Sequence, residues 1–215
     1  PDDESLACGG LLARAAALGA RVVVLSLTRG EAGPAGAPDA HAVAELGTRR
    51  TAEFQAAARV LGASQALVRD HADGMLTWIE PAVLDADLGD AIETLRPDVV
   101  VTFDADGLYW HPDHIAVHER TTAVVARCGP RAPALFYVSM PHGQMREVSA
   151  RAGGQPIVPG LDDPDAFGAG APAPTLVIDA GPLAARKLAA IQCHRSQFAA
   201  SAFAMLTGDD AALIA

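Results

Sequence analysis

The sequence predicts an α/β protein in which helices cover both faces of a mostly parallel β-sheet. Two observations favour this fold class: strand-length apolar segments alternate with helical segments, and the strands are continuous apolar runs rather than in–out alternations. Of the 215 residues, 50% are hydrophobic and 20% are charged, a balance that excludes a disordered chain. No domain boundary is evident, so we expect residues 1–215 to form a single domain.

The predicted strands and helices differ in composition and period. The strands are short apolar runs, several of them β-branched, at residues 21–27, 66–68, 98–103, 135–140 and 175–178. The helices place apolar residues at helical spacing, at residues 5–18, 43–61, 83–95, 112–127 and 183–194. Residues 28–47 predict a long loop in which a helix begins late. Residues 141–174 predict a long irregular segment, of the kind that forms a lid, a binding loop or a disordered stretch.

Charge and cysteine content exclude several classes of protein. The net charge of −10 repels phosphate backbones and anionic lipids, so we expect neither a nucleic-acid nor a membrane partner. No apolar run reaches the roughly 18 residues that a membrane span needs. The three cysteines are too scattered for a disulfide framework, and we expect them to be buried in a reducing, cytoplasmic setting. The oligomeric state stays open, with a homo-oligomer among the alternatives.

Polar residues gather where the predicted strands end. Residues 28–31 follow the strand at 21–27, and residues 104–111 follow the strand at 98–103. Residues 1–4 precede a helix, where a strand lying upstream would end. Because ligands of an open parallel sheet bind beyond the carboxyl ends of its strands, the sequence predicts a site at this edge.

The sharpest local motif is His111-Pro112-Asp113-His114. Proline suits the first turn of a helix, so the two histidines fall on one side of that turn. Imidazole is a common zinc ligand and a common general acid, and a nearby carboxylate can fix its tautomer. A helix cap with incidental histidines is the alternative reading. We expect His118, one turn further, to be a solvated helix histidine.

The carboxylates Asp2, Asp3 and Glu4 stand at the start of a predicted helix. Favourable placement at the positive end of the helix dipole would explain their charge. The functional reading gives one carboxylate to a metal and leaves its neighbour as a base. A catalytic zinc site takes three protein ligands and one water. Asp3 and His114 would supply two of them, with the third expected from a histidine upstream of Pro1.

Other catalytic motifs are missing from the sequence. Cys8-Gly9-Gly10 is no dinucleotide fingerprint, and no phosphate-binding loop or serine-nucleophile elbow is present. Cys193 and His194 are adjacent in sequence, which does not suit a nucleophile–base pair. A redox enzyme is therefore disfavoured.

Six motifs stand in order along the chain: PDDE at 1–4, T-x-G-E-x-G at 28–33, R-x-x-E at 50–53, R-P-D at 96–98, HPDH at 111–114, and K-x-x-A…H-x-S-Q within 187–197. Together they resemble the LmbE-like, PIG-L-type zinc-dependent N-acetylglucosaminyl deacetylases, which include the mycothiol-pathway deacetylase. The family's first motif begins with a histidine, which is not in this sequence, and its first central strand is missing with it. We interpret this gap as unrecorded upstream residues, because a sheet lacking that strand would expose two strand edges.

The resemblance implies a Rossmann-like three-layer sandwich and a metal-dependent hydrolase. The enzyme would remove an N-acetyl or related N-acyl group from a small molecule that contains an amino sugar. The resemblance implies Zn²⁺ held by the upstream histidine, Asp3 and His114, with a zinc-bound water attacking the amide carbonyl and Asp2 as general base. Another divalent ion such as Fe²⁺ stays open, since N/O ligands bind several.

Further roles are implied by the same resemblance. His111, oriented by Asp113, would share the developing oxyanion with the metal and assist departure of the amine, with Tyr109 beside it. Three residues match positions that face the sugar, the last more weakly: Arg50, Glu31 and Asp73. We leave Lys187, His194 and Gln197 outside the catalytic set as structural residues.

Two alternatives remain from the sequence. One is an amidase acting on another acylated amine, such as a thiol conjugate or an antibiotic sugar, which the segment 141–174 would decide. The other is a metal-free sugar- or nucleotide-binding module on the same α/β scaffold. Bound zinc and acetate release would separate the two classes.

Overall fold

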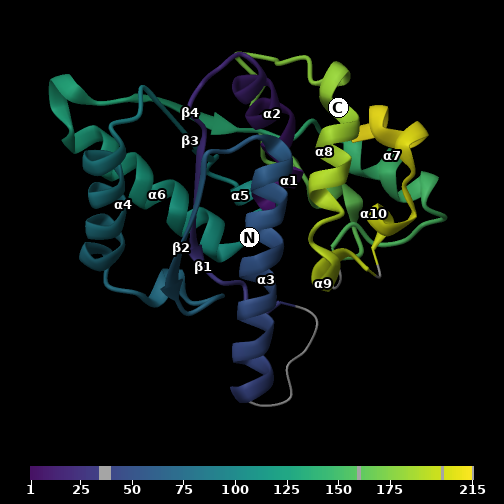
Figure 1. The fold of residues 1–215 in the computed structure, drawn as a ribbon, viewed down its shortest axis with the longest axis horizontal. Helices are drawn as coiled ribbons and strands as arrows, with labels where there is room; N and C mark the ends of the chain where they lie inside the picture. The colour runs from purple at the N-terminus through teal and green to yellow at the C-terminus, as the bar shows by residue number, and fades with distance from the viewer. Residues whose placement is uncertain (34–39, 159–160, 200, 215) are drawn as a thin grey trace. The chain divides into compact units, whose positions relative to one another are not determined.

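The computed structural model describes residues 1–33, 40–158, 161–199 and 201–214. It contains helices and parallel strands, as the sequence predicts, and divides into two compact units (Figure 1). Unit 1 comprises Pro1–Asp73, His142–Asp165 and Pro174–Ala215, and unit 2 comprises Gly74–Pro141 and Ala166–Ala173. The expectation of one domain over residues 1–215 stays a prediction.

Unit 1 is built around a parallel β–α–β arrangement. Strands β1 (Val23–Thr28) and β2 (Gln65–His71) pair in parallel, and helix α3 (Ala40–Leu61) lies between them in the chain. The register runs from Val23 opposite Gln65 to Thr28 opposite His71, with an irregularity between Ser26 and Thr28. Parallel pairing brings the carboxyl ends of β1 and β2 to the same edge, where the loop that follows β1 carries candidate residues.

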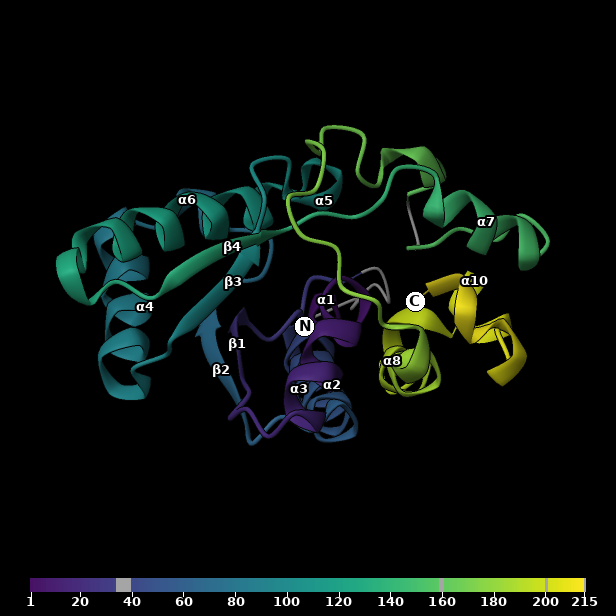
Figure 2. The ribbon, with the colours of Figure 1, turned by 90° about the horizontal axis from the view of Figure 1, so that it is seen from above.

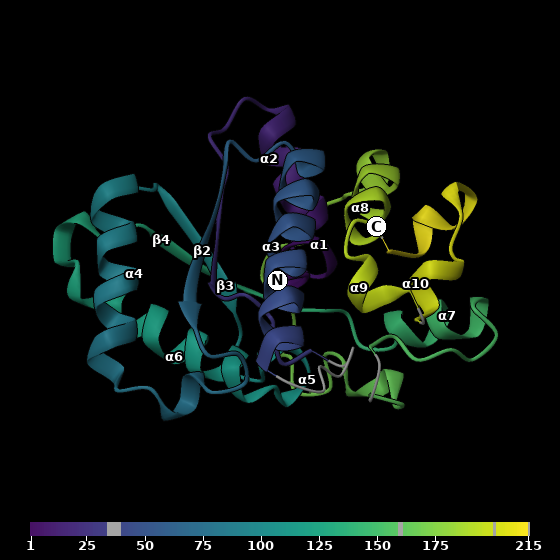
Figure 3. The ribbon, with the colours of Figure 1, turned by 60° about the horizontal axis from the view of Figure 1, so that its bottom comes forward.

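Helices form the rest of unit 1. They are α1 (Asp3–Leu6), α2 (Gly9–Ala17), α7 (Gln144–Arg151), α8 (Ala184–Ile191), α9 (Arg195–Phe198) and α10 (Ala202–Met205). Figure 3 shows α8 beside α1 and α3, and the three are in contact. Ala13, Ala57, Leu61 and Ala190 form a fully buried cluster where α2, α3 and α8 meet. Alanine at three of these positions lets the helix backbones approach closely. Helix α1, with its acidic start, packs directly against α3 and α8.

Unit 2 repeats the parallel crossover. Strands β3 (Val99–Phe103) and β4 (Ala134–Val138) pair in parallel from Val99 opposite Ala134 to Phe103 opposite Val138. Between them the chain forms α5 (Gly107–Trp110) and α6 (Pro112–Arg127), and α4 (Pro81–Leu95) packs against α6 (Figure 2). The segment between β3 and α6 therefore stands at the carboxyl end of β3, where the sequence predicts a site.

Four predicted strands and the helices within 43–127 are confirmed to within a few residues. The predicted strand at 175–178 is wrong: no strand is formed there, and Leu176 and Val177 are 61% and 78% exposed. An apolar β-branched run becomes a strand only where a neighbour accepts its hydrogen bonds. The predicted helix at 5–18 is broken at Ala7 and Cys8 into α1 and α2.

The irregular segment predicted at 141–174 contains a helix, α7, so that prediction is partly wrong. Met145 and Val148 are buried on α7, a two-residue apolar pattern too short to stand out in the sequence. Helices α9 and α10 lie beyond the last predicted helix. Residues 34–39 of the predicted loop at 28–47, and residues 159–160, lie outside the described residues. In the described part of the chain, no helix combines the length and apolarity needed to span a membrane.

Candidate active site

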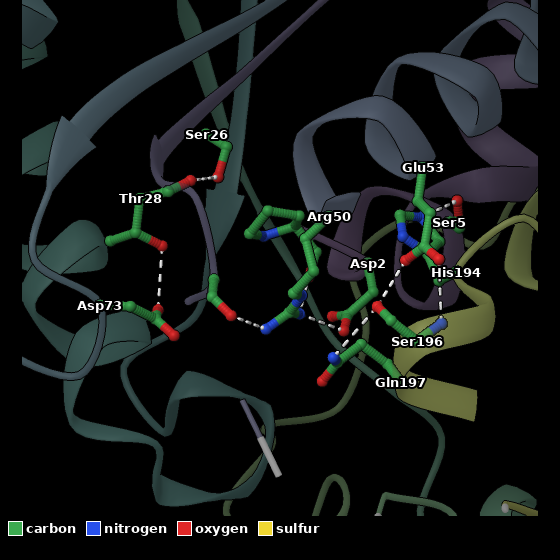
Figure 4. A network of polar contacts seen from close by, with 12 residues as sticks. Asp2, Ser5, Ser26, Thr28, Arg50, Glu53, Asp73, His194, Ser196 and Gln197 are labelled. Carbon is green, nitrogen blue, oxygen red and sulfur yellow. Dashed lines mark hydrogen bonds and ion pairs between the residues drawn. The ribbon is translucent and has the colours of Figure 1, made fainter. Parts of the chain in front are cut away.

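The chain enters α1 through a strained turn at Asp2. Asp2 has a φ of 101°, in a region that residues other than glycine rarely occupy. Arg50, reaching from α3, donates from Nη2 to the Pro1 carbonyl (2.9 Å) and to Asp2 Oδ2 (2.8 Å), and from Nη1 to the Gly30 carbonyl (2.5 Å) (Figure 4). The Arg50 side chain is 6% exposed and that of Asp2 is 19% exposed. The buried guanidinium of Arg50 thus holds the strained turn at Asp2, and the Asp2 carboxylate remains partly exposed to solvent.

Two effects raise the pKa of the Asp2 carboxyl from 3.8 to about 6: burial, which is the larger, and repulsion by the neighbouring Asp3. The positive charge of Arg50 opposes both effects. A carboxylate of raised pKa is a better proton acceptor near neutral pH than an ordinary aspartate. Asp3, the first residue of α1, is half-buried.

Glu4 anchors the turn from its other side. The Asp2 backbone N–H donates to Glu4 Oε2 (2.8 Å), while Ser5 Oγ (2.6 Å) and His194 Nε2 (2.7 Å) donate to Glu4 Oε1. Burial alone would raise the pKa of Glu4, but the hydrogen bonds from His194 and Ser5 outweigh it and lower that pKa below 4.5. His194 is fully buried at 0% exposure. The Glu4 carboxylate is therefore a saturated anchor and is not available as a ligand for substrate.

Two of the three residues predicted to face a sugar, Glu31 and Asp73, lie in the loops after β1 and β2, and the third, Arg50, lies on α3. Asp73 accepts from Thr28 Oγ1 (2.9 Å) and from the Ala32 backbone N–H (3.0 Å), so both of its carboxylate oxygens hold the loop. The Asp73 backbone N–H donates to Glu31 Oε1 (2.9 Å). Glu31 Oε2 is buried and has no hydrogen-bond partner. An unpaired buried oxygen costs about 1–3 kcal/mol, so Glu31 is the member of this group that is best prepared to accept a ligand's hydrogen bond.

In unit 2, the ring of His114 is held in one tautomer. Its Nδ1 lies 3.0 Å from the Gly107 carbonyl oxygen, which can only accept, so Nδ1 carries the proton and Nε2 keeps the lone pair. Phe103 stacks on the ring with a centroid distance of 4.0 Å and an interplanar angle of 4°. His114 is 8% exposed. A neutral imidazole with Nδ1 bonded to a backbone carbonyl is the form that binds metal through Nε2.

The structure brings His111 and Tyr109 to His114. The ring centroids of His111 and His114 are 4.5 Å apart, and Tyr109 lies edge-on to both rings at 5.7 and 5.4 Å. His111 Nδ1 accepts from the backbone N–H of Asp113 (3.2 Å), which leaves the proton of the neutral ring on Nε2. The two imidazoles thus present opposite functions, a donor at His111 and a lone pair at His114.

Asp113 is a buried anchor at the start of α6. Its carboxylate accepts from the backbone N–H groups of Gly74 (2.8 Å) and Leu76 (3.0 Å), and the residue is 5% exposed. Its hydrogen bond to His111 comes from the backbone. The predicted role of Asp113 in orienting His111 stays a prediction.

Backbone strain surrounds this cluster. Leu108 and Trp110 have φ values of 68° and 64°. Gly107 has a φ of 56°, and a Cβ there would lie 3.0 Å from His114 Cβ, so only glycine fits. His118, expected to be solvated, is half-buried, with Nδ1 donating to the Phe103 carbonyl (2.9 Å); that expectation is wrong.

Sequence reasoning left out the contacts made by the segment after α8. Ser196 donates to Glu53 from its backbone N (2.9 Å) and from Oγ (2.6 Å), and His194 donates to Glu4. The H-x-S-Q motif could have indicated that these residues matter, but no local sequence pattern predicts that they contact Glu4 and Glu53. Among the residues that the structure describes, no three His, Cys, Asp or Glu side chains form a group that could hold a metal ion. The predicted set took only Asp3 and His114 from this chain.

Comparison with known proteins decides the family. A profile of the GlcNAc-PI de-N-acetylase (PIG-L) family matches residues 1–125. The chain belongs to this family. The predicted resemblance is thereby confirmed.

Relatives of this PIG-L family member carry consistent names. A 1D-myo-inositol 2-acetamido-2-deoxy-alpha-D-glucopyranoside deacetylase 1 of Saccharopolyspora erythraea is 35% identical, over 92% of this chain and 75% of the relative. A protein named 1D-myo-inositol 2-acetamido-2-deoxy-alpha-D-glucopyranoside deacetylase in Mycolicibacterium vanbaalenii is 32% identical, over 94% of this chain and 79% of its own length.

Solved structures share the fold of this PIG-L family member. The conserved protein TT1542 from Thermus thermophilus matches with a TM-score of 0.65 and 27% identity, over 91% of this chain and 75% of that one. The N,N'-diacetylchitobiose deacetylase of Pyrococcus horikoshii matches with a TM-score of 0.65 and 21% identity, over 92% and 67%. These matches confirm the predicted Rossmann-like α/β class. A 4-carboxy-2-hydroxymuconate hydratase also matches, with a TM-score of 0.61 and 20% identity, so the fold alone does not specify the reaction.

Proposed function

We propose that this chain is a metal-dependent hydrolase that removes the N-acetyl group from a small molecule containing an N-acetylglucosamine unit. The observation that carries the proposal is the match, over 92% of the chain, to a 35% identical relative named as a deacetylase of a 2-acetamido-2-deoxy-glucopyranoside of inositol. The substrate class proposed is therefore a glucosaminide whose 2-amino group is acetylated.

Carboxylate and imidazole side chains are donors of the kind that Zn²⁺ takes. In the proposal, Asp3 and His114 are two of its ligands, and the His114 tautomer described above leaves Nε2 free of a proton, as a ligand requires. When bound, zinc supplies Lewis acidity, which polarises an amide carbonyl and makes water more acidic. Fe²⁺ accepts the same nitrogen and oxygen donors.

The side chains of the chain carry the proton transfers. Asp2 is the general base: its carboxylate takes a proton from the attacking water as the new C–O bond forms. Arg50 keeps that carboxylate in place through the hydrogen bond at 2.8 Å. His111 donates a hydrogen bond from Nε2 to the oxygen that becomes negative, and the proton that Asp2 has taken from water passes to the nitrogen, assisted by His111, as the C–N bond breaks. Acetate and the free amine are the products, and Tyr109 lies against the His111 ring to assist the same oxygen.

The sugar is bound in this proposal by the loop after β1. Glu31 Oε2, buried and without a partner, accepts a sugar hydroxyl. Asp73 acts mainly by shaping the loop, because Thr28 and Ala32 occupy its two oxygens. Arg50 contributes through the same loop, since it holds the Gly30 carbonyl.

Acetate release tests the proposal. The metal-loaded protein is incubated with N-acetylglucosaminyl-inositol, simple N-acetylglucosaminides and other N-acetylated amines, with and without a chelator. We expect release from the glucosaminides, loss with chelator and recovery on adding Zn²⁺. Release only from the other amines would favour the amidase alternative. Binding of sugars without release, by protein that holds no metal, would favour the binding module.

The variant Asp2→Asn distinguishes a role of Asp2 as general base from a role in metal binding. We expect this isosteric variant to retain bound zinc but to lose kcat by roughly 100-fold or more, the usual contribution of a general base. Elemental analysis and initial rates measure the two effects. An unchanged kcat would remove Asp2 from the role of base.

A further inference from the structure

We infer that His194 is a positioning residue, which acts through Glu4 to hold Asp2 in its strained conformation. This inference rests on the proposed function, in which Asp2 is the base. His194 lies outside the residues that would touch substrate or metal, and it comes from the segment between α8 and α9, 192 positions beyond Asp2 in the sequence.

The connection runs through three short hydrogen bonds. His194 Nε2 donates to Glu4 Oε1 at 2.7 Å, and the other oxygen of the same carboxylate accepts the Asp2 backbone N–H at 2.8 Å. Ser5 Oγ adds a third donor to Glu4 at 2.6 Å. His194 is 0% exposed and Glu4 9%, so water does not replace any of these donors. The orientation of the Glu4 carboxylate, and with it the acceptor for Asp2 N–H, is set by protein groups.

The tautomer of His194 follows from its surroundings. Its Nδ1 is buried without any hydrogen-bond partner, so a proton there would be an unpaired buried donor. Because a carboxylate can only accept, the proton of the bond to Glu4 lies on His194 Nε2. The same nitrogen lies 3.4 Å from Ser5 Oγ, so its two hydrogen-bond contacts are both with α1. Phe198 holds the ring edge-on, with centroids 6.4 Å apart.

The contacts close into a ring around the turn (Figure 4). Helix α3 contributes Arg50 and Glu53, one helical turn apart. Arg50 holds the Asp2 side chain and the Pro1 carbonyl, and Glu53 accepts from both donors of Ser196, two residues after His194. The full ring is Asp2, Glu4, His194, Ser196, Glu53 and Arg50. Hydrogen bonds join its members except from His194 to Ser196 and from Glu53 to Arg50, where the chain itself makes the connection. A φ of 101° at an aspartate persists only where its surroundings over-determine it, and this ring fixes both the side chain and the backbone of Asp2.

Loss of the His194 donor would leave Glu4 Oε1 held only by the hydroxyl of the adjacent Ser5, so that the carboxylate can rotate. Asp2 N–H would then lose its acceptor, and the backbone would relax toward an ordinary φ, which moves the base away from the attacking water. A displacement of about 1 Å at a reacting group reduces turnover on the order of 100-fold. Substrate binding by Glu31 in the loop after β1 is not part of this path, so KM should change much less than kcat.

The test compares two replacements of His194. His194→Gln keeps an N–H donor of similar reach, whereas His194→Leu keeps the volume and removes the donor. Asp210→Ala is the matched control in unit 1: Asp210 is 6% exposed, and its carboxylate accepts from Thr207 and, at 2.6 Å, from Arg151 Nε. It shares no contact with the ring described above.

For His194→Leu we expect a 10- to 100-fold loss of kcat, a KM within about threefold of wild type and unchanged zinc content. His194→Gln should recover kcat to within a few-fold. Asp210→Ala should lower Tm comparably without changing kcat. Equal loss in the Gln and Leu variants, or a loss in His194→Leu no larger than in Asp210→Ala, would overturn the inference.

Hydrogen exchange provides a readout that does not depend on turnover. The peptide covering residues 2–6 should exchange faster in His194→Leu than in wild type, and at the wild-type rate in His194→Gln and Asp210→Ala. Unchanged exchange in His194→Leu contradicts the positioning role. If the wild-type protein releases no acetate from any substrate, the proposed function fails, and the exchange data still decide whether His194 controls the Asp2 turn.

Discussion

A methyl group added at Gly30 is expected to destabilise the protein by two separable effects. Gly30 has a φ of 73°, and a Cβ built there would lie 2.5 Å from Arg50 Cζ and Nη1. The left-handed conformation costs an L-residue about 1 kcal/mol or slightly more. The contact with the guanidinium is too close to be tolerated, so Arg50 has to move.

The second cost can be worked from the bonds that Arg50 makes. It donates to the Gly30 carbonyl, the Pro1 carbonyl and Asp2 Oδ2, all within 2.9 Å. Hydrogen bonds to charged groups contribute about 1.5–3 kcal/mol each, so losing one or two of them costs about 3 kcal/mol. With backbone strain, Gly30→Ala should lower the free energy of unfolding by about 4 kcal/mol.

Gly19→Ala supplies the matched control. Gly19 has a φ of 85°, and nothing lies within 4 Å of a Cβ built there, so this variant pays the backbone cost alone, about 1 kcal/mol. Urea denaturation followed by far-UV circular dichroism measures both variants. If Gly30→Ala and Gly19→Ala agree within about 0.5 kcal/mol, displacement of Arg50 costs nothing and the clamp on Asp2 is not a stabilising contact.

Two further outcomes are expected. His114→Ala should lose bound zinc, measured by elemental analysis after dialysis, while His118→Ala keeps it; full zinc occupancy in His114→Ala would contradict the ligand assignment. Burial lowers the pKa of Lys187 from 10.5 to about 8, so between these two pH values the unfolded chain still binds a proton that the folded state has lost. Stability should therefore rise from this residue between pH 8 and 10.5, and the advantage of Lys187→Met over wild type should shrink by on the order of 3 kcal/mol across that window. Lys187 is the only lysine in the sequence, so pH-dependent acylation followed by mass spectrometry gives its pKa directly, and an ordinary value near 10.5 would contradict this reasoning.

Strands β1, β3 and β4 were readable from sequence because each is largely a continuous apolar run, and of β2 only the apolar residues 66–68 were. Residues 98–103 show this best, since β3 occupies Val99–Phe103. The segment 175–178 has the same composition and forms no strand, because pairing depends on a neighbour that composition does not reveal. Helix α7 was missed for the opposite reason: a short helix with two buried apolar residues gives too weak a periodic signal.

The candidate site also contains residues that the sequence predicts and residues that it does not. Motifs named Asp2, Asp3, His111 and His114, because their chemistry is local to short runs of sequence. The support of these residues is not local: Glu4 meets His194 across 190 positions, and no period or turn rule predicts that pairing. The sequence indicated the type of reaction, and the structure shows which contacts hold the side chains proposed to carry it.

Backbone strain is found in both candidate clusters, the one around Asp2 and the one around His114. In the described part of the chain, four residues other than glycine have a positive φ, and three of them, Asp2, Leu108 and Trp110, lie within the two candidate clusters. Local propensity favours glycine at each, and an unsupported residue there would relax. The strain costs stability, of order 1–3 kcal/mol at each position, and is retained where surrounding contacts over-determine the backbone. At Asp2 those contacts are visible, in the Arg50 clamp and the Glu4–His194 pair, so the residues that offset the strain are the ones whose replacement should most directly disturb the reaction.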